Sequence, residues 1–223
     1  MKIGILGGTK LASTLGNKML AMNQTVVFGV REDFVTKEIE WKILNMYLDK
    51  IFSYDTAIEM SDILLICCEN EHLPKVCESL SASDLKNKII IDCTNGAYTA
   101  EFSCNTTLIK KSIGQNKLFK AFNNLGIDYP KSDPMGLVKE TYFCGPDSAE
   151  KQSVKKIIEW VGFRPVDAGE IENAEQLQGG VGNALGLHTQ LLGTLLQEKA
   201  REHGHVFTAL AQGGQSQADH IQA

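Results

Sequence analysis

The chain begins MKIGILGGTKLA, residues 1–12, and this stretch decides the fold. Lys2–Leu6 is a short apolar run that predicts a buried strand, and residues 11–22 have the apolar periodicity of an amphipathic helix. Between strand and helix lies the turn Gly7-Gly8-Thr9-Lys10-Leu11-Ala12. A glycine turn in this position is typical of dinucleotide binding, because the pyrophosphate rests on N–H groups at the positive end of the helix dipole. We therefore expect this turn, with Gly7 and Gly8 at its start, to hold a dinucleotide.

Two positions of the turn differ from the usual glycine pattern. Thr9 stands where a second glycine normally lets the backbone approach the pyrophosphate. Its hydroxyl could donate a hydrogen bond to a phosphate oxygen, or it could crowd the nucleotide, and the sequence leaves both open. Ala12 replaces the third glycine, and we expect this small side chain to pack against the first strands.

The rest of the chain alternates short apolar runs with amphipathic stretches, which is typical of βαβ units and a parallel sheet. Further strands are expected at 25–29, 51–52, 63–67, 88–92, 117–122, 140–144 and 164–167. Helices are expected at 35–46, 73–80, 106–113, 149–161, 170–178 and 184–203. The predicted fold is α/β, a Rossmann-type doubly wound, mostly parallel sheet with a helical C-terminal extension. We expect a nucleotide-binding domain at 1–169 and the extension at 170–223.

The end of the second predicted strand indicates which dinucleotide is bound. NAD enzymes place Asp or Glu here to bind the ribose 2′-hydroxyl, but this chain has Gly29 and, two residues later, Arg31. Arg31 can hold a 2′-phosphate with two hydrogen bonds, and Lys37 could add charge. The adjacent Glu32 weakens this argument, and a solvated surface role for Arg31 stays open. The sequence favours NADP(H) over NAD(H).

Composition excludes several classes of protein. A net charge of −5 and a pI of about 5.6 argue against nucleic-acid binding. No apolar run reaches the roughly 20 residues of a membrane helix, and the N-terminus does not resemble a signal peptide. We therefore expect a cytoplasmic protein that contacts neither nucleic acid nor membrane.

The six cysteines are scattered along the chain. In a reducing compartment they are most simply buried small hydrophobic residues. No Cys or His group has metal-ligand spacing, so we expect no metal site.

Several later segments resemble a single family. They are CCENEHL (67–73), IDCTN (91–95), KAFNNLG (120–126), FCGPDS (143–148) and GFRPVDAG (162–169), with Glu172-Asn173-Ala174 after them. In this order they resemble the coenzyme F420-dependent NADP oxidoreductases and their relatives, among them the cytosolic domains of six-transmembrane metalloreductases. The resemblance covers about residues 1–178.

The resemblance implies that NADPH lies in the Rossmann cleft and exchanges hydride with a flavin or a deazaflavin of the F420 type. It implies a pyrophosphate contact at Thr9, Lys10 and Leu11 and a 2′-phosphate contact at Arg31. It also places three residues beside the nicotinamide ribose, Cys67, Cys68 and His72, and two near the nicotinamide ring, Ala121 and Asn123. Each of these has a structural alternative: the cysteines could pack in the core, His72 could cap a helix, and Asn123 could stabilise its own turn. Hydride transfer between two bound cofactors needs positioning rather than an acid or base, so we expect no catalytic side chain.

Two departures from the family concern the acceptor side of the cleft. Glu175 stands where many relatives carry Arg, and the segment 179–183 begins an extension that shorter members lack. Two alternatives therefore stay open. The chain could reduce a small imine or keto acid, since its turn also resembles that of pyrroline-carboxylate reductases and His188 follows a glycine-rich segment like that of β-hydroxyacid dehydrogenases. It could also be a non-catalytic NADP(H)-binding module.

The extension suggests self-association. Residues 184–200 place several leucines on one broad helical stripe, more than a solvated terminal helix would carry. We expect this stripe to be buried in a homodimer, with packing on its own domain as the alternative.

Overall fold

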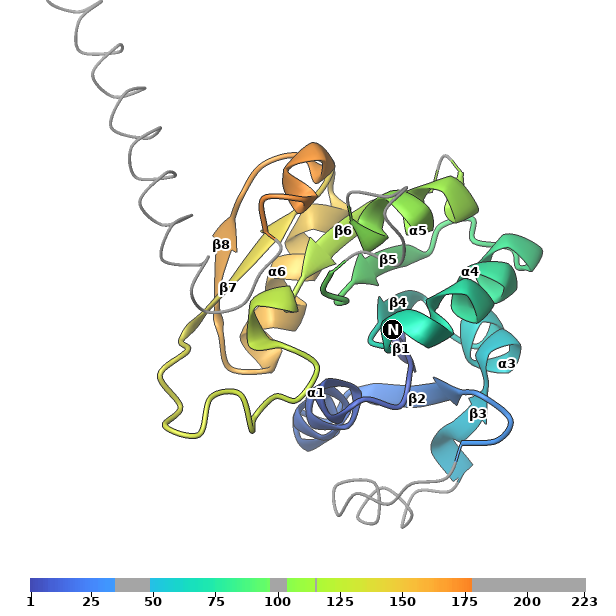
Figure 1. Cartoon of the computed structure of the whole chain (residues 1–223), viewed down its shortest axis with the longest axis horizontal. Coiled ribbons are helices and arrows are strands. Elements are labelled where there is room, and N and C mark those ends of the chain that lie inside the picture. Colours follow the sequence, from blue (N-terminus) through green and yellow to red (C-terminus); the bar gives the residue numbers. More distant parts are fainter. Residues whose placement is uncertain (35–48, 97–103, 115, 178–223) are drawn as a thin grey trace, which may run out of the picture. The chain divides into compact units, whose positions relative to one another are not determined.

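The computed structural model describes residues 1–34, 49–96, 104–114 and 116–177 (Figure 1). The chain divides into two units, Met1–Ala184 and Leu185–Ala223. The predicted helices at 35–46 and 184–203, together with Lys37 and His188, lie outside the described residues. The predicted extension is described only as far as residue 177.

The described residues form one sheet of eight strands in the order β3-β2-β1-β4-β5-β6-β7-β8. The strands are β1 (Lys2–Leu6), β2 (Thr25–Val30), β3 (Ile51–Ser53), β4 (Ile63–Ile66), β5 (Ile89–Asp92), β6 (Leu118–Ala121), β7 (Glu140–Cys144) and β8 (Arg164–Asp167). Neighbours from β3 through β6 pair in parallel, β7 pairs with β6 antiparallel, and β8 runs parallel to β7. This is the predicted mostly parallel, doubly wound sheet.

Helices cover both faces of the sheet (Figure 1). They are α1 (Lys10–Ala21), α3 (Tyr54–Glu59), α4 (Leu73–Ala82), α5 (Asn105–Ile113) and α6 (Glu150–Trp160), with the 3₁₀ turns η2 (Asn70–His72), η3 (Asn123–Leu125) and η4 (Ile171–Ala174). The apolar sides of α1 and α6 pack into one buried cluster, and those of α3, α4 and α5 pack into another. All four residues of β4 are buried, as a strand covered on both faces requires.

Two local predictions differ from the structure. Helix α3 was not predicted, because its six residues are too few to show a helical period; Ser53 caps it, its Oγ accepting a hydrogen bond from the Thr56 N–H. Over 170–178 the chain forms only the 3₁₀ turn η4 within the described residues. The Asn173 side chain donates a hydrogen bond to the Ala168 carbonyl there, and this side-chain contact competes with a regular helix.

A buried ion pair joins the carboxyl ends of β5 and β6. Lys120 and Asp92 are both 0% exposed, and the Lys120 Nζ lies 2.8 Å from the Asp92 Oδ2. The ammonium also donates to the Thr94 carbonyl and the Thr106 Oγ1, each at 3.1 Å. Three acceptors therefore meet the three protons of the ammonium, as a buried cation requires.

Removing one partner of this pair should destabilise the fold strongly. Lys120→Met leaves the Asp92 carboxylate buried without its cation, and we expect the free energy of unfolding to fall by about 3–5 kcal/mol. Lys117→Met is the matched control, because Lys117 pairs with Glu150 at the surface and should cost less than about 1 kcal/mol. Urea unfolding measures both; equal costs for the two variants would contradict the prediction.

Candidate functional site

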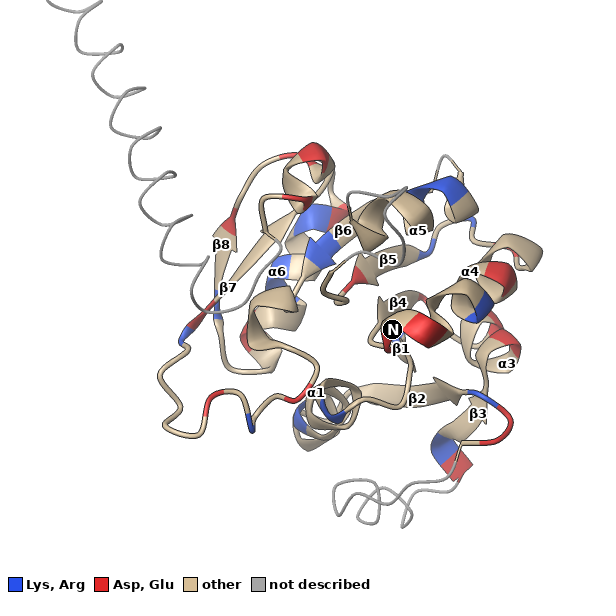
Figure 2. Ribbon diagram, viewed as in Figure 1, with Lys and Arg blue, Asp and Glu red and all other residues tan. Residues whose placement is uncertain are grey.

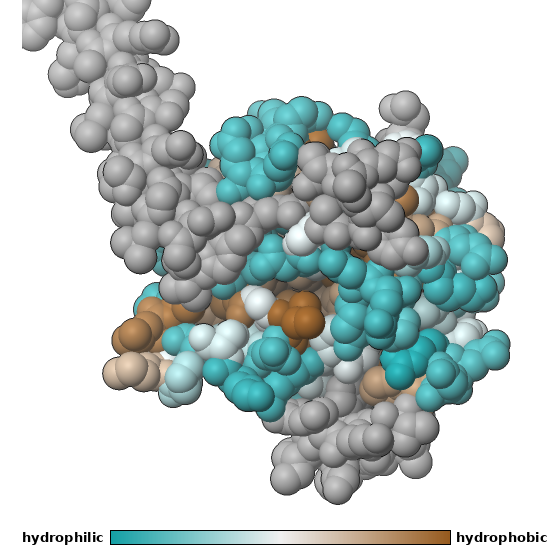
Figure 3. All heavy atoms as spheres, viewed as in Figure 1, coloured by the Kyte–Doolittle hydropathy of each residue, from teal (hydrophilic) through white to brown (hydrophobic). Residues whose placement is uncertain are grey.

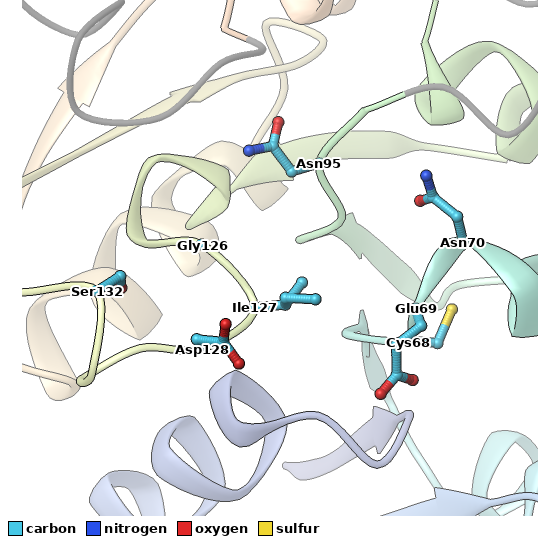
Figure 4. Close-up of a pocket in the computed structure, with 8 residues that line it drawn as sticks. All are labelled: Cys68, Glu69, Asn70, Asn95, Gly126, Ile127, Asp128 and Ser132. Carbon is cyan, nitrogen blue, oxygen red and sulfur yellow. The ribbon is translucent and has the colours of Figure 1, made fainter.

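The candidate site lies at the carboxyl ends of the parallel strands. The strand order reverses between β1 and β4, and open α/β sheets bind ligands at such a switch point. A pocket of about 430 Å³ opens here, lined by Cys68, Glu69, Asn70, Asn95, Gly126, Ile127, Asp128 and Ser132 (Figure 4). Its walls therefore come from the segments that follow β4, β5 and β6. This face is mostly hydrophilic, with a hydrophobic spot at its centre (Figure 3).

The glycine turn joins β1 to α1 as predicted. Gly7 has a φ of +133°, and a Cβ built on it would lie 2.3 Å from the Cys67 carbonyl oxygen. Only glycine fits this position, because the backbone of the segment after β4 passes directly against it. A Cβ on Gly8 would lie 2.3 Å from the Phe34 ring. Ala12 is fully buried in the core with the residues of β1, as predicted.

The Thr9 hydroxyl is engaged within the protein. It accepts a hydrogen bond from the Ala12 N–H at 3.1 Å and donates one to the Cys67 carbonyl at 2.7 Å. Thr9 is the N-cap residue of α1 and is only 4% exposed. A hydroxyl has a single proton, and this one is donated to the Cys67 carbonyl.

The segment after β6 reaches over the start of α1. The Leu11 N–H donates to the Ile127 carbonyl at 2.8 Å, and the Thr14 hydroxyl donates to the Tyr129 carbonyl at 3.1 Å. Lys10, the first residue of α1, is partly exposed. A pyrophosphate that used the Leu11 N–H would have to displace the Ile127 carbonyl. One wall of the pocket is thus attached directly to the predicted phosphate-binding turn.

Arg31 and His72 lie in contact. In Figure 2 the chain changes from basic to acidic just after β2, and there the Arg31 Nε lies 2.8 Å from the Asp33 Oδ1. The Arg31 guanidinium lies 5.6 Å from the centre of the Phe34 ring, and its Nη1 lies 3.0 Å from the His72 Nε2. The sequence placed these two residues at different parts of the nucleotide, whereas the structure brings them together.

Cys67 and Cys68 follow β4 and are each 1% exposed. Cys67 belongs to the core, while Cys68 lines the pocket. Burial, followed by the effect of neighbouring Cys67, raises the pKa of the Cys68 thiol well above its usual value. Cys68 is therefore an uncharged thiol at neutral pH. All six cysteines are free and buried, as expected of small hydrophobic residues.

Ala121 and Asn123 are buried beside the pocket rather than in its wall. Ala121 is 0% exposed in the core, and Asn123 is 1% exposed with its Nδ2 donating to the Leu177 carbonyl. The Asn123 Oδ1 and the Glu69 Oε2 are buried without a hydrogen-bond partner among the described residues. Both atoms are acceptors, so a ligand N–H or O–H could satisfy them.

Sequence reasoning missed most of the pocket lining. Glu69, Gly126, Ile127, Asp128 and Ser132 were not among the expected site residues, although each lies in a segment that follows a parallel strand. Their position at strand ends was the signal that could have found them. Among the described residues, no group of three or more His, Cys, Asp or Glu could hold a metal ion. In the same part of the chain, no helix is long and apolar enough to cross a membrane.

The Thr9 contacts predict a structural role for its hydroxyl. Thr9→Val keeps the shape but removes the cap of α1 and the bond to Cys67, so the free energy of unfolding should fall by about 1–2 kcal/mol. Nucleotide affinity should change by less than about threefold, because the hydroxyl proton is already used. Thr14→Val is the matched control in the same helix. A large loss of nucleotide affinity at unchanged stability would show that Thr9 is a phosphate ligand.

Known proteins resemble this chain in both sequence and fold. Metalloreductase STEAP3 of Rattus norvegicus is 22% identical over 180 residues, which are 79% of this chain and 36% of the relative. Metalloreductase STEAP2 of Mus musculus is 19% identical over 177 residues, 79% of this chain and 35% of that protein. The chain thus spans about a third of the length of these curated relatives.

Solved structures share the fold at low sequence identity. A proposed F420-dependent NADP reductase from Arthrobacter sp. FB24 has a TM-score of 0.67 and 18% identity, with 87% of this chain and 94% of that chain covered. A pyrroline-5-carboxylate reductase from Coxiella burnetii has a TM-score of 0.60 and 18% identity, with 91% and 71% covered. A reductive aminase from Aspergillus terreus in complex with NADPH has a TM-score of 0.57 and 16% identity, with 88% and 62% covered.

A family model supports the resemblance that the sequence motifs carry. Residues 2–96, from β1 through the segment after β5, match the family described as "NADP oxidoreductase coenzyme F420-dependent". This region contains the glycine turn, Arg31, Cys67, Cys68 and His72. Over residues 2–96, which are less than half of the chain, the sequence is similar to this family.

Proposed function

We propose that the chain binds NADP(H) at the glycine turn and Arg31 and transfers hydride between it and a flavin or deazaflavin acceptor in the pocket. The observation that carries this proposal is the pocket itself. It lies at the switch point, it touches the glycine turn through Ile127, and its volume of about 430 Å³ suits a small organic ligand. The family match over residues 2–96 supports the same reaction class.

The residues present fit NADP(H). Gly7 and Gly8 have no Cβ, and the dipole of the 12-residue helix α1 favours an anion at its start. Arg31 is about one-third exposed and follows the strand that ends beside the ribose in this fold. Its Nη atoms can turn to a 2′-phosphate while Asp33 holds Nε.

Catalysis in this proposal is a matter of position. NADPH, when bound, supplies a hydride from its nicotinamide ring. Asn70 and Asn95 offer amide groups in the pocket wall, and Ile127 contributes an apolar surface to it. Cys68 is uncharged and lines the pocket.

A second function is favoured by one observation. Glu69 and Asp128 place two carboxyl groups in the pocket wall (Figure 4), and reduction of an imine or keto acid requires a proton donor. The likeness to reductive aminase and pyrroline-5-carboxylate reductase structures is a likeness of fold. His188, the residue that the sequence suggested for this role, lies outside the described residues.

Three further expectations stay proposals. A homodimer formed through 184–200 rests on residues that the structure does not describe. Cytoplasmic location rests on composition. A non-catalytic NADP(H)-binding module had its support in Thr9, and the Thr9 hydroxyl is directed at Cys67 rather than into the nucleotide site.

The cofactor assignment predicts a selective effect of Arg31. Arg31→Ala should weaken NADPH binding by about 1.5–3 kcal/mol, the value of a charge-assisted contact, and leave NADH binding nearly unchanged. Arg164→Ala, which removes an exposed arginine on β8, is the matched control. Titration of both nucleotides measures the effect. Equal losses for NADPH and NADH would show that Arg31 does not contact the 2′-phosphate.

The two reaction classes differ in their need for a proton donor. With a flavin acceptor, single-turnover NADPH oxidation should be nearly flat between about pH 6 and 8, and Glu69→Gln or Asp128→Asn should slow it by about tenfold or less. His72→Ala should likewise slow the reaction by about tenfold or less, through weaker binding and poorer positioning of NADPH. A different result would instead favour an imine or keto acid substrate. In it, the rate of NADPH oxidation falls by about 10²–10⁴ in one carboxyl variant or in His188→Ala, and the pH dependence of the rate seen in the wild type disappears in that variant.

A further inference from the structure

The contact between Arg31 and His72 constrains the charge on the imidazole. The Arg31 Nη1 lies 3.0 Å from the His72 Nε2, and the two side chains are 35% and 25% exposed. A guanidinium has no acceptor atom and keeps its protons at every physiological pH. Of the two atoms, only the Nε2 can therefore accept this hydrogen bond.

The same nitrogen faces a carboxylate. The Glu71 Oε1 lies 3.2 Å from the His72 Nε2, so Nε2 can either accept from Arg31 or donate to Glu71, but it cannot do both. An imidazole without a proton on Nε2 satisfies Arg31, and one with a proton on Nε2, either the neutral tautomer or the imidazolium, satisfies Glu71. A ligand that binds Arg31 therefore shifts the Nε2 from accepting the Arg31 hydrogen bond toward donating to Glu71.

Other charged and titratable groups surround the pair. Asp33 holds the Arg31 Nε from the turn after β2. Tyr54 of α3 is uncharged, because burial raises its pKa to about 12. The charges of Arg31, Asp33 and Glu69 also act on this pKa. Lys75 on α4 is held by Glu78. The Arg31 guanidinium and a protonated His72 can lie side by side when a bound anion lies between them, because the Asp33 and Glu71 carboxylates are also next to them.

We propose that His72 is a second side chain that binds the 2′-phosphate, and that binding of NADPH protonates its imidazole. This inference rests on the proposed function, in which Arg31 contacts that phosphate. A phosphate that takes the Arg31 Nη1 leaves the His72 Nε2 without its donor. The nitrogen then takes a proton from solvent, and the imidazolium gives the dianion a second positive charge, with the new Nε2 proton donated to the phosphate in place of Arg31 or to Glu71.

Proton uptake distinguishes this role from simple packing. Isothermal titration of NADPH and NADH into the full chain at pH 7.5, in two buffers of different ionisation enthalpy, gives the number of protons taken up. At this pH a phosphate monoester is already largely dianionic, since its second pKa is about 6. We expect up to about one proton for NADPH and none for NADH, because only NADPH brings the phosphate that protonates His72. Between pH 6.5 and 8.5 NADPH affinity should fall by up to about tenfold per pH unit, the slope that uptake of one proton requires, because the protonated imidazole is lost as pH rises, while NADH affinity stays constant.

His72→Asn should abolish the proton uptake and its pH dependence and weaken NADPH binding about tenfold, with NADH unchanged. Lys75→Gln, an exposed substitution one turn further along, should leave all four quantities as in the wild type. Wild-type binding of NADPH without proton uptake, or equal losses of both nucleotides in His72→Asn, would overturn the inference even where Arg31→Ala is selective for NADPH. Equal losses in Arg31→Ala would overturn the proposed cofactor site and this inference with it.

Discussion

The site depends on a buried ion pair at the carboxyl ends of two strands. Lys120 and Asp92 are fully buried and held by Thr94 and Thr106. From there the network continues through the Asn105 amide, which donates to the Thr94 hydroxyl and to the Asn70 Oδ1 in the pocket wall. The segments that follow β4 and β5 and the start of α5 are thus fixed to one another by polar contacts that tolerate no loss of a partner.

This arrangement ties the two halves of the proposed site together. On one side of the switch point, the glycine turn packs against the Cys67 carbonyl, and on the other the Ile127 carbonyl accepts from the Leu11 N–H. The Leu11 N–H, a proposed nucleotide contact, is therefore bonded to a protein carbonyl that a pyrophosphate would have to replace. The free energy of nucleotide binding therefore depends on the difference between the hydrogen bonds to the nucleotide and the bonds within the protein that they replace. This difference is small for a neutral hydrogen bond and larger for the charged contacts at Arg31.

The fold is shared by proteins with different reactions, so it does not by itself identify the acceptor. The same sheet is found in a proposed F420-dependent NADP reductase, a pyrroline-5-carboxylate reductase and a reductive aminase. The distinguishing chemistry lies in the pocket wall, where the two carboxyl groups of Glu69 and Asp128 lie among amides and a neutral thiol. Whether these carboxyl groups donate a proton or only line the acceptor separates the two reaction classes.

The sequence by itself determined the strand-turn-helix at the N-terminus, the mostly parallel sheet and the similarity to the family whose model matches residues 2–96, because each is encoded in contiguous runs. The bounds of β1, β7 and β8 agree with prediction for the same reason. The tertiary structure alone decided that the Thr9 hydroxyl bonds Cys67, that His72 meets Arg31, and that Ile127 reaches Leu11. Those contacts join residues from different strand ends. A local pattern cannot specify them, because they exist only once the sheet has placed those ends side by side.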